Sequence, residues 1–221
     1  MTQPTYDQIL STLGAIDENP YDYEKISPFE KSLLPKGFQG NVYNMSYKWR
    51  GIVTELDVPM KIMEIGSYHG ANAISLTKTF AKHPKSEIHC VDPWADYQDY
   101  NEYKGKQTTN YSLFMHNVAL LPPEELQKFY IHRMPSHVID AHFVDETFDI
   151  IYIDGNHAPL YVLQDALISL RKVVPGGYLI FDDVADKKVL NALQMFLHAS
   201  QHLIENQVQT RFGQAYVKKR K

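Results

Sequence analysis

The sequence predicts an α/β protein built on a parallel sheet with helices on both faces. Short, continuously apolar runs such as Phe148–Ile153 are typical of strands that are buried on both sides. These runs alternate along the chain with longer segments of helical spacing. Two runs, Phe148–Ile153 and Gly177–Phe181, stop at acidic residues. The carboxyl ends of parallel strands form the edge where such sheets bind ligands, so we expect a functional site there.

The composition is that of a soluble globular protein. The 221 residues suffice for one large domain, and 44% of them are hydrophobic and 22% charged. A formal net charge of −4 argues against a general nucleic-acid binder. No apolar run approaches the roughly 20 residues of a membrane-spanning helix. We therefore expect neither nucleic acid nor a membrane among the partners.

The single cysteine, Cys90, lies inside an apolar run and is expected in the core. One cysteine makes no intrachain disulfide and no zinc cluster, which is compatible with a reducing compartment. The first residues lack the pattern of a signal peptide. We expect a cytoplasmic protein, and we leave a homo-oligomer open.

The N-terminal part of the chain differs from the rest. We expect residues 1–40 to form an extension, with a short helix at Tyr6–Leu13 and proline and glycine residues that break longer elements. Apolar residues in Val42–Leu56 follow helical spacing and predict a second helix. Residues 41–221 are then expected to form one domain.

The remaining elements follow in alternation. The predicted strands are Lys61–Ile65, Glu87–Val91, Lys128–His132, Phe148–Ile153, Gly177–Phe181, and two near the end of the chain, around Leu203–Val208 and Gln214–Lys218. The predicted helices are Ala71–Ala81, one near Tyr111–Leu121, a short one at Ser136–Ile139, Leu160–Val173 and Lys187–Ala199.

A glycine-containing loop joins the first strand to its helix. Gly66 allows a sharp turn and close approach of a ligand, and the helix that follows offers free amides to a carboxylate. The spacing from Gly66 to Gly70 is not that of a dinucleotide fingerprint. An ordinary tight turn is the alternative.

Three further residues lie at strand ends on the same expected edge. Asp92 follows the second strand and can accept hydrogen bonds from both hydroxyls of a ribose, unless it is an ordinary strand-end acid. Trp94 packs either on a ligand or on the core. Ser136 follows the third strand, where it can contact an adenine ring.

Acidic residues gather after the fourth and fifth strands. Asp154 follows one and Asp182-Asp183 the other, with His157 three residues beyond Asp154. Three carboxylates and a histidine at one edge repel or perturb one another unless a cation lies among them. Oxygen ligands favour Mg²⁺ or Mn²⁺ over zinc. The alternative is that these acids only cap the following helices.

The ordered set of motifs resembles class I S-adenosylmethionine (SAM)-dependent methyltransferases. The resemblance rests on Glu64-Ile65-Gly66-Ser67-x-x-Gly70, Asp92, Ile153-Asp154-Gly155-Asn156-His157 and the segment Pro175–Asp183. The most similar subgroup is that of metal-dependent O-methyltransferases of the macrolide-sugar and cephalosporin-hydroxylase-associated type, with catechol and caffeoyl-CoA O-methyltransferases more distant. The similarity extends from about Lys61 to the C-terminus.

The resemblance implies a Rossmann-like sheet of seven strands in the order 3-2-1-4-5-7-6, with the last pair reversed. It implies that SAM, leaving as S-adenosylhomocysteine, is bound by Glu64, Gly66, Ser67, Tyr68, Gly70, Asn72, Asp92, Trp94, Ser136 and Asp154. Asp154, Asp182 and Asp183 match the divalent-metal ligands of the family, and His157 matches a catalytic histidine. Asp183 departs from the Asn that is usual in catechol enzymes and agrees with the sugar-type subgroup.

These residues predict an O-methyltransferase that acts on a sugar hydroxyl, for example that of a deoxysugar such as rhamnose in a glycan or glycoside. The hydroxyl needs a base, and His157 is the first candidate, with Asp154 as the alternative. Three other readings stay open: a catechol-like acceptor, a non-catalytic SAM-binding protein, and a nicotinamide dehydrogenase, which the missing dinucleotide spacing opposes.

Tyrosines predict a lid over the acceptor. The stretch Asp92–Tyr111 carries Trp94 and the tyrosines 97, 100, 103 and 111, whose faces and hydroxyls suit a carbohydrate or a phenol. We expect it to work with Tyr43 and Tyr47 on one face of the preceding helix. The alternatives are a surface loop and core packing. For His69, beside the glycine loop, we expect a structural or acceptor-rim role.

Overall fold

The computed structural model of the protein describes residues 27–54, 57–96 and 103–221. The chain divides into two compact units. One unit, here called the C-terminal unit, contains residues 62–66 and 135–221 of the described chain. The other, here called the N-terminal unit, contains its residues between 27 and 61 and between 67 and 134. Each unit is treated separately below.

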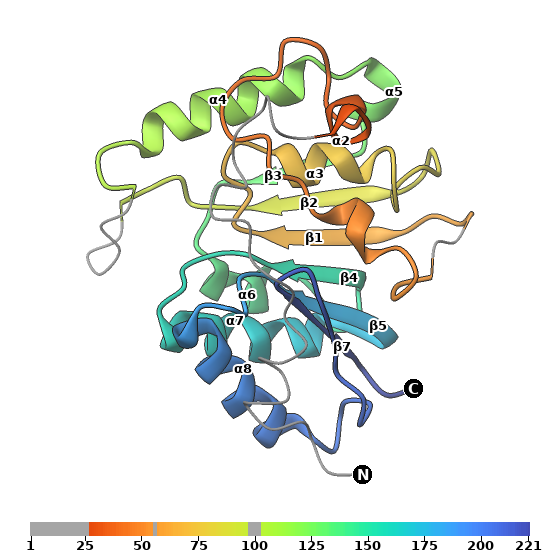
Figure 1. The fold of residues 1–221 in the computed structure, drawn as a ribbon, viewed down its shortest axis with the longest axis vertical. Coiled ribbons are helices and arrows are strands. Elements are labelled where there is room, and N and C mark those ends of the chain that lie inside the picture. The colour runs from red at the N-terminus through yellow and green to blue at the C-terminus, as the bar shows by residue number, and fades with distance from the viewer. Residues whose placement is uncertain (1–26, 55–56, 97–102) are drawn as a thin grey trace. The chain divides into compact units, whose positions relative to one another are not determined.

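The described residues form seven strands in the order β3-β2-β1-β4-β5-β7-β6, which confirms the predicted Rossmann-like methyltransferase fold. The pairs β2–β3, β1–β4 and β4–β5 are parallel, and β7 runs antiparallel to both β5 and β6. The strands are β1 (Lys61–Ile65), β2 (Glu87–Val91), β3 (Phe129–His132), β4 (Phe148–Ile153), β5 (Val173–Phe181), β6 (Gln209–Arg211) and β7 (Gln214–Lys218) (Figure 1).

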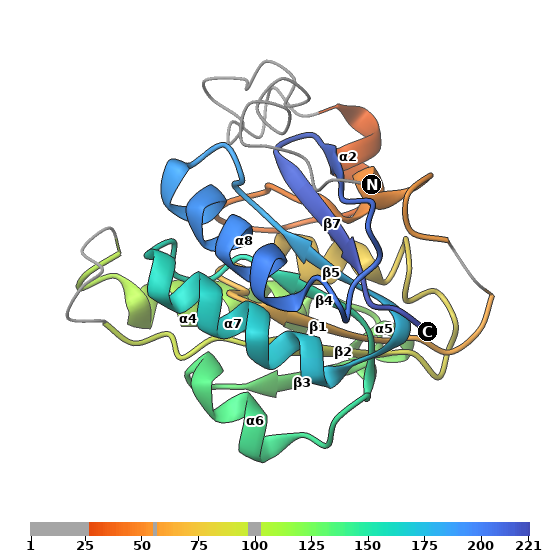
Figure 2. The same cartoon turned by 90° about the horizontal axis from the view of Figure 1, so that it is seen from below.

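Four helical segments belong to the C-terminal unit, counted over its described residues. They are η2 (Ser136–Val138), α6 (Ile139–His142), α7 (Pro159–Lys172) and α8 (Lys187–Ser200). Figure 2 shows α7 and α8 side by side along β4 and β5. The ring of Phe181 lies 5.5 Å from that of Phe196 on α8, so Phe181 faces this helical layer. Asp182 directly follows the last residue of β5, so its side chain points to the face of the sheet opposite that of Phe181.

The described N-terminal unit carries five short or medium helices. They are α2 (Pro28–Ser32), η1 (Ser46–Trp49), α3 (Ala71–Leu76), α4 (Gln107–Ala119) and α5 (Pro123–Leu126). Sequence reasoning missed α2, because Pro28 indicated a break, and it assigned no element to the residues of α5. Pro28 and Pro123 both occupy the first helical turn, where the missing amide costs nothing. A capping box between Ser27 and Glu30 fixes the start of α2.

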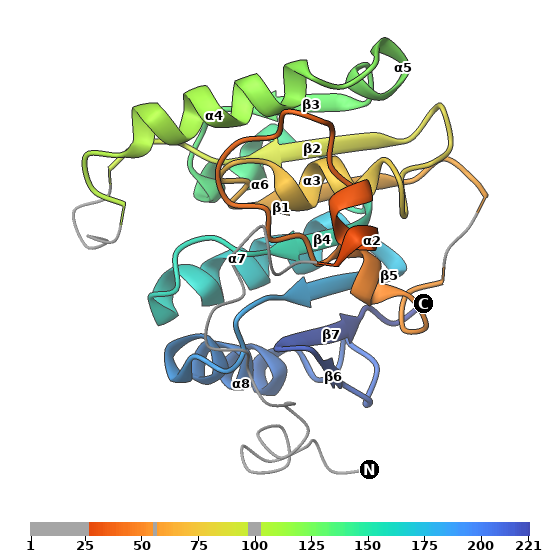
Figure 3. The same cartoon turned by 45° about the horizontal axis from the view of Figure 1, so that its top comes forward.

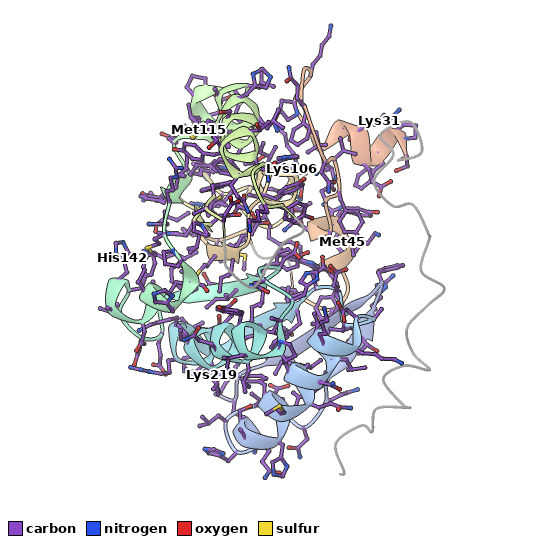
Figure 4. The ribbon with its side chains drawn as sticks, turned by 90° about the vertical axis from the view of Figure 1, so that its left-hand side faces the viewer. Lys31, Met45, Lys106, Met115, His142 and Lys219 are labelled. Atoms are coloured by element: carbon purple, nitrogen blue, oxygen red, sulfur yellow. The ribbon has the colours of Figure 1, made fainter. Side chains whose placement is uncertain are left out.

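The helix predicted at Val42–Leu56 is wrong. Over residues 42–54, the part of this stretch that the structure describes, the only helix is η1, which begins after Met45, the residue labelled in Figure 4. Gly51 then turns the backbone at φ +86°. The amides of Met45 and Ser46 donate to Oδ1 of Asn72 at 2.9 and 2.8 Å, so a side chain replaces helical hydrogen bonds. The apolar residues of this stretch are buried although most of it is irregular. Tyr43 lies before η1 and Tyr47 within it, so the two tyrosines do not share a helix face.

The strand predicted at Leu203–Val208 is also wrong. In that stretch only Ile204 forms an isolated bridge, to Lys219, and β6 begins at Gln209. The cause is the two-residue turn at Phe212-Gly213, both at positive φ, which pairs Arg211 with Gln214 and sets the register. Figure 3 shows β6 beside β7.

One predicted helix is shorter in the structure, and other predictions concern residues that the structure does not describe. The helix expected to reach Ala81 ends at Leu76, where hydroxyls of Thr77 and Thr79 bond to backbone carbonyls of the preceding turn. The predicted helix Tyr6–Leu13 and the tyrosines 97 and 100 fall outside the described residues. Within the described chain, no helix combines the length and apolarity that crossing a membrane requires.

Candidate active site

The loop after β1 depends on Gly66. This residue has φ +88°, and a Cβ there would lie 2.0 Å from the backbone oxygen of Asp154. The ends of β1 and β4 are in register, and the amide of Asp154 donates to the oxygen of Ile65 at 2.9 Å. Only glycine lets the two loops approach this closely, so the glycine and acidic motifs meet in the C-terminal unit.

Asp92 holds the next part of the loop within the N-terminal unit. Its carboxylate accepts from the amide of Tyr68 at 3.0 Å and from that of Trp94 at 2.7 Å. Both donors have left-handed backbones, with φ of 45° and 40°. Burial raises the pKa of Asp92, while hydrogen bonds from Trp94, Tyr68 and Ser67 lower it. The carboxylate therefore fixes two strained residues beside the predicted ribose position.

Trp94 and Asn72, both expected at the cofactor, have structural partners. The indole of Trp94 is 2% exposed, donates to the oxygen of Tyr68 at 2.9 Å and packs 4.7 Å from the ring of Phe114. The Oδ1 of Asn72 holds the segment before η1, as described above. Of the two roles considered for Trp94, these contacts describe core packing.

His69 is tied into the N-terminal unit by both ring nitrogens. Nδ1 accepts from the amide of Asn41 at 2.9 Å, and Nε2 lies 3.2 Å from Oδ1 of Asn110. Because Nδ1 must accept, the ring proton lies on Nε2 and the imidazole is neutral. Burial lowers the pKa of His69, which favours the same state. The ring stacks on Tyr68 at 3.7 Å, and these contacts fit the structural role.

Two buried polar atoms near the motifs fit a ligand. Oγ of Ser67 and Nδ2 of Asn156 are two of the eight buried side-chain atoms that have no hydrogen-bond partner in the described chain. The other side-chain atom of Asn156 is used, since Oδ1 accepts from the amide of Ala158 at 2.9 Å. A buried polar group without a partner costs about 1–3 kcal/mol. A polar ligand such as SAM would satisfy groups of this kind.

Ser136 lies at the start of η2 in the C-terminal unit. Its hydroxyl hydrogen-bonds the carboxyl of Asp165 on α7, a side chain that is 3% exposed. Burial raises the pKa of Asp165 to about 7, and the bond from Ser136 opposes this. Sequence reasoning missed Asp165 because nothing marks a lone acid inside a helix as buried.

The acidic cluster forms after β4 and β5. Ligand atoms of Asp154, His157 and Asp183 all lie within 4.8 Å of one another. Nε2 of His157 is 3.4 Å from a carboxylate oxygen of Asp183, which has φ +50°. A non-glycine residue in this conformation is strained, and such strain concentrates at functional sites.

The electrostatics of this cluster suit a divalent cation. Burial raises the pKa of Asp154 well above its usual range, and the charges of Asp182, Asp183 and Glu64 raise it further. Burial and the charge of Asp183 raise the pKa of Asp182 to about 7. Crowded carboxylates repel one another, and a bound cation would offset this repulsion. Hard oxygen donors with one imidazole fit Mg²⁺ or Mn²⁺.

Asp182 has a partner that sequence reasoning missed. It is 4% exposed, and Oδ2 accepts from the hydroxyl of Tyr152 at 2.5 Å. The three residues whose ligand atoms lie within 4.8 Å of one another are Asp154, His157 and Asp183, and the role of Asp182 as a metal ligand stays a prediction. Strand alternation was the available signal, since Tyr152 lies two residues before Asp154 on the same face of β4.

Comparison with known proteins points to the same chemistry as the motifs. A family model described as a methyltransferase domain matches residues 63–184. No curated protein matches the chain.

The following solved structures share the fold at low sequence identity. A candidate O-methyltransferase of Klebsiella pneumoniae has a TM-score of 0.59 at 13% identity, over 90% of this chain and 93% of that one. The O-methyltransferase TomG of Streptomyces achromogenes, involved in tomaymycin synthesis and solved with SAM, has a TM-score of 0.55 at 14% identity, over 89% and 82%.

Proposed function

The chain belongs to the methyltransferase-domain family, and we propose that it transfers a methyl group from SAM to a sugar hydroxyl with the help of a divalent cation. The family model covers more than half of the chain, and the protein is a SAM-dependent methyltransferase. The single observation that carries the proposed metal dependence is the convergence of Asp154, His157 and Asp183 within 4.8 Å.

SAM binding is assigned to the residues of the glycine motif and the strand ends. Gly66 leaves room for close approach, and Ser67 offers a buried hydroxyl that has no partner in the described chain. Glu64, Tyr68 and Gly70 shape the loop. Asp92 would bind the ribose, since a carboxylate offers about four acceptor positions and the amides of Tyr68, Trp94 and Ser67 occupy three of them. Ser136 would face the adenine.

The acidic residues would hold the cation and the acceptor. Asp154, Asp182 and Asp183 would supply the carboxylates, which leaves the ring of His157 beside them for the acceptor proton. A bound Mg²⁺ or Mn²⁺ lowers the pKa of an alcohol and fixes its oxygen. The protein would also orient that oxygen toward the methyl group of SAM, and this alignment contributes to the rate of transfer.

His157 is the proposed base. Its ring is held 3.4 Å from Asp183, whose carboxylate would stabilise the imidazolium formed when the ring takes the acceptor proton. General-base catalysis of this kind contributes roughly 10²–10⁴-fold to a rate. Asp154 is the alternative base, because a metal-bound carboxylate can also receive a proton. Asn156 can orient either group through its buried amide nitrogen.

The acidic character of position 183 favours a sugar over a catechol. In the resemblance drawn from the sequence, catechol enzymes usually carry Asn there, whereas this chain carries Asp. A vicinal diol of a sugar can present two oxygens to a hard cation, as a catechol can, so the acceptor class must be tested directly. A catechol-like phenol remains the second candidate.

The test is methyl transfer from labelled SAM to a panel of acceptors. The panel contains rhamnosides and other deoxysugar glycosides, sugars lacking vicinal hydroxyls, and catechols, each with Mg²⁺ or Mn²⁺ present. We expect label in the glycosides. Methyl label found only in the catechols would show that the acceptor is a phenol rather than a sugar. SAM binding without transfer to any acceptor would favour a non-catalytic protein.

A further inference from the structure

A row of buried polar residues crosses the sheet of the C-terminal unit. We call it the polar row and define it as Tyr152, Asp182, Gln214 and Tyr216, from β4, the end of β5 and β7. These residues are 1%, 4%, 0% and 2% exposed. Phe181 faces α8, so alternation along β5 places Asp182 on the face opposite that helix. Such a row inside a core is costly unless its hydrogen bonds are satisfied.

The hydrogen bonds of the polar row run in one direction. The hydroxyl of Tyr216 donates to Oε1 of Gln214 at 2.8 Å, which leaves the amide nitrogen of Gln214 for its other neighbours. That nitrogen lies 3.3 Å from the hydroxyl oxygen of Tyr152 and donates to it. Because Gln214 presents a donor, the single proton of Tyr152 must go elsewhere. It goes to Oδ2 of Asp182 at 2.5 Å.

The carboxylate that Tyr152 holds acts on Asp154. After burial, the charge of Asp182 is the next cause that raises the pKa of Asp154, so the two carboxylates at these neighbouring strand ends repel each other. Gln214 adds a second hydrogen bond to Asp182. A rigid donor such as Tyr152 holds Asp182 in place against this repulsion, where water has little access.

We propose that Tyr152, aimed by Gln214 and Tyr216, is a positioning residue that holds the carboxylate of Asp182 in place beside Asp154 for a divalent cation. This inference rests on the metal dependence proposed above. It assigns Tyr152 no contact with the reacting atoms. Partners that orient metal ligands in this way typically change metal affinity by about 10–100-fold when removed.

The experiment is a Mn²⁺ titration of the full chain, with free Mn²⁺ followed by electron paramagnetic resonance. Tyr152→Phe removes the donor to Asp182 and keeps the ring. We expect its Mn²⁺ affinity to fall by about 10–100-fold. SAM affinity, measured without metal, should stay within about twofold, which general damage to the fold would not allow. Tyr178→Phe is the matched control, since this β5 tyrosine lies over Lys218 and should bind Mn²⁺ like the wild type.

Tyr216→Phe is the second variant. It leaves Tyr152 in place and frees the Gln214 amide to turn, so that Tyr152 can donate to Gln214 instead of to a carboxylate. We expect a smaller loss of Mn²⁺ affinity than in Tyr152→Phe. This variant decides the matter if thermal unfolding shows that Tyr152→Phe does not fold.

Two outcomes separate the inference from the proposal beneath it. If the wild type binds Mn²⁺ and the folded variants bind it equally well, the positioning role of Tyr152 is overturned while the metal site stands. If the wild type itself binds no Mn²⁺ in the presence of SAM, the proposed metal dependence is overturned, and the inference with it.

Discussion

Replacing Gly66 by alanine should separate the ends of β1 and β4. The new Cβ would lie 2.0 Å from the backbone oxygen of Asp154, whereas Cβ atoms essentially never approach other atoms within 3.0 Å. The two backbones must therefore part by about 1 Å. The left-handed φ of +88° adds about 1–2 kcal/mol of strain for a residue with a side chain.

The movement also strains the hydrogen bond from the Asp154 amide to Ile65, which is 2.9 Å long and contributes roughly 0.5–1.5 kcal/mol. Together these effects predict a loss of about 1.5–3.5 kcal/mol in the free energy of unfolding, before the clash itself is counted. Guanidinium unfolding followed by circular dichroism measures this loss. SAM binding by calorimetry should weaken in parallel, because the loop that would hold the cofactor is displaced.

Two alanine variants separate the causes. Gly105 has φ +75° and open space around its Cβ position, so Gly105→Ala reports the backbone strain alone. Gly155 has ordinary contacts of 3.4 Å or more and no positive φ, so Gly155→Ala should cost little. The reasoning fails if Gly66→Ala is no less stable than Gly105→Ala and binds SAM as the wild type does.

The remaining predictions concern the base and a buried acid. His157→Ala should lower turnover by roughly 10²–10⁴-fold while thermal unfolding stays unchanged, and unaltered turnover would transfer the base role to Asp154. Asp165 has a pKa raised to about 7 by burial, so its neutral form is the stable one in the fold. As the pH rises from about 4 to about 7, the wild type should lose stability relative to Asp165→Asn, by at most about 1.4 kcal/mol per pH unit. Urea unfolding of both proteins at pH 4.5, 6 and 8 checks this, and a constant difference would contradict it.

The strands and the motifs at their ends could be predicted from the sequence because both depend on local patterns. The runs Lys61–Ile65, Glu87–Val91 and Phe148–Ile153 match β1, β2 and β4 residue for residue. A run of β-branched and apolar residues that is followed by an acid is typical of a buried parallel strand. The convergence of Asp154 and Asp183 then follows from strand order.

The features that sequence reasoning missed depend on partners far away in the chain. The segment around Met45 has helical spacing, but the amide acceptor that prevents a helix is Asn72, more than 20 residues later. The partner of Asp182 is Tyr152 on another strand. The direction in which the Tyr152 hydroxyl donates depends on Gln214, which lies on β7. Spacing along one segment carries no information about such pairings.

The most direct test of the proposed chemistry is metal-dependent methyl transfer by the full chain. Transfer from labelled SAM to the glycoside acceptor should stop in excess EDTA, and added Mg²⁺ or Mn²⁺ should restore it. SAM binding should persist in EDTA, because Asp154 is the one residue of the acidic cluster that is also assigned to the cofactor. Full turnover in excess EDTA would contradict the account.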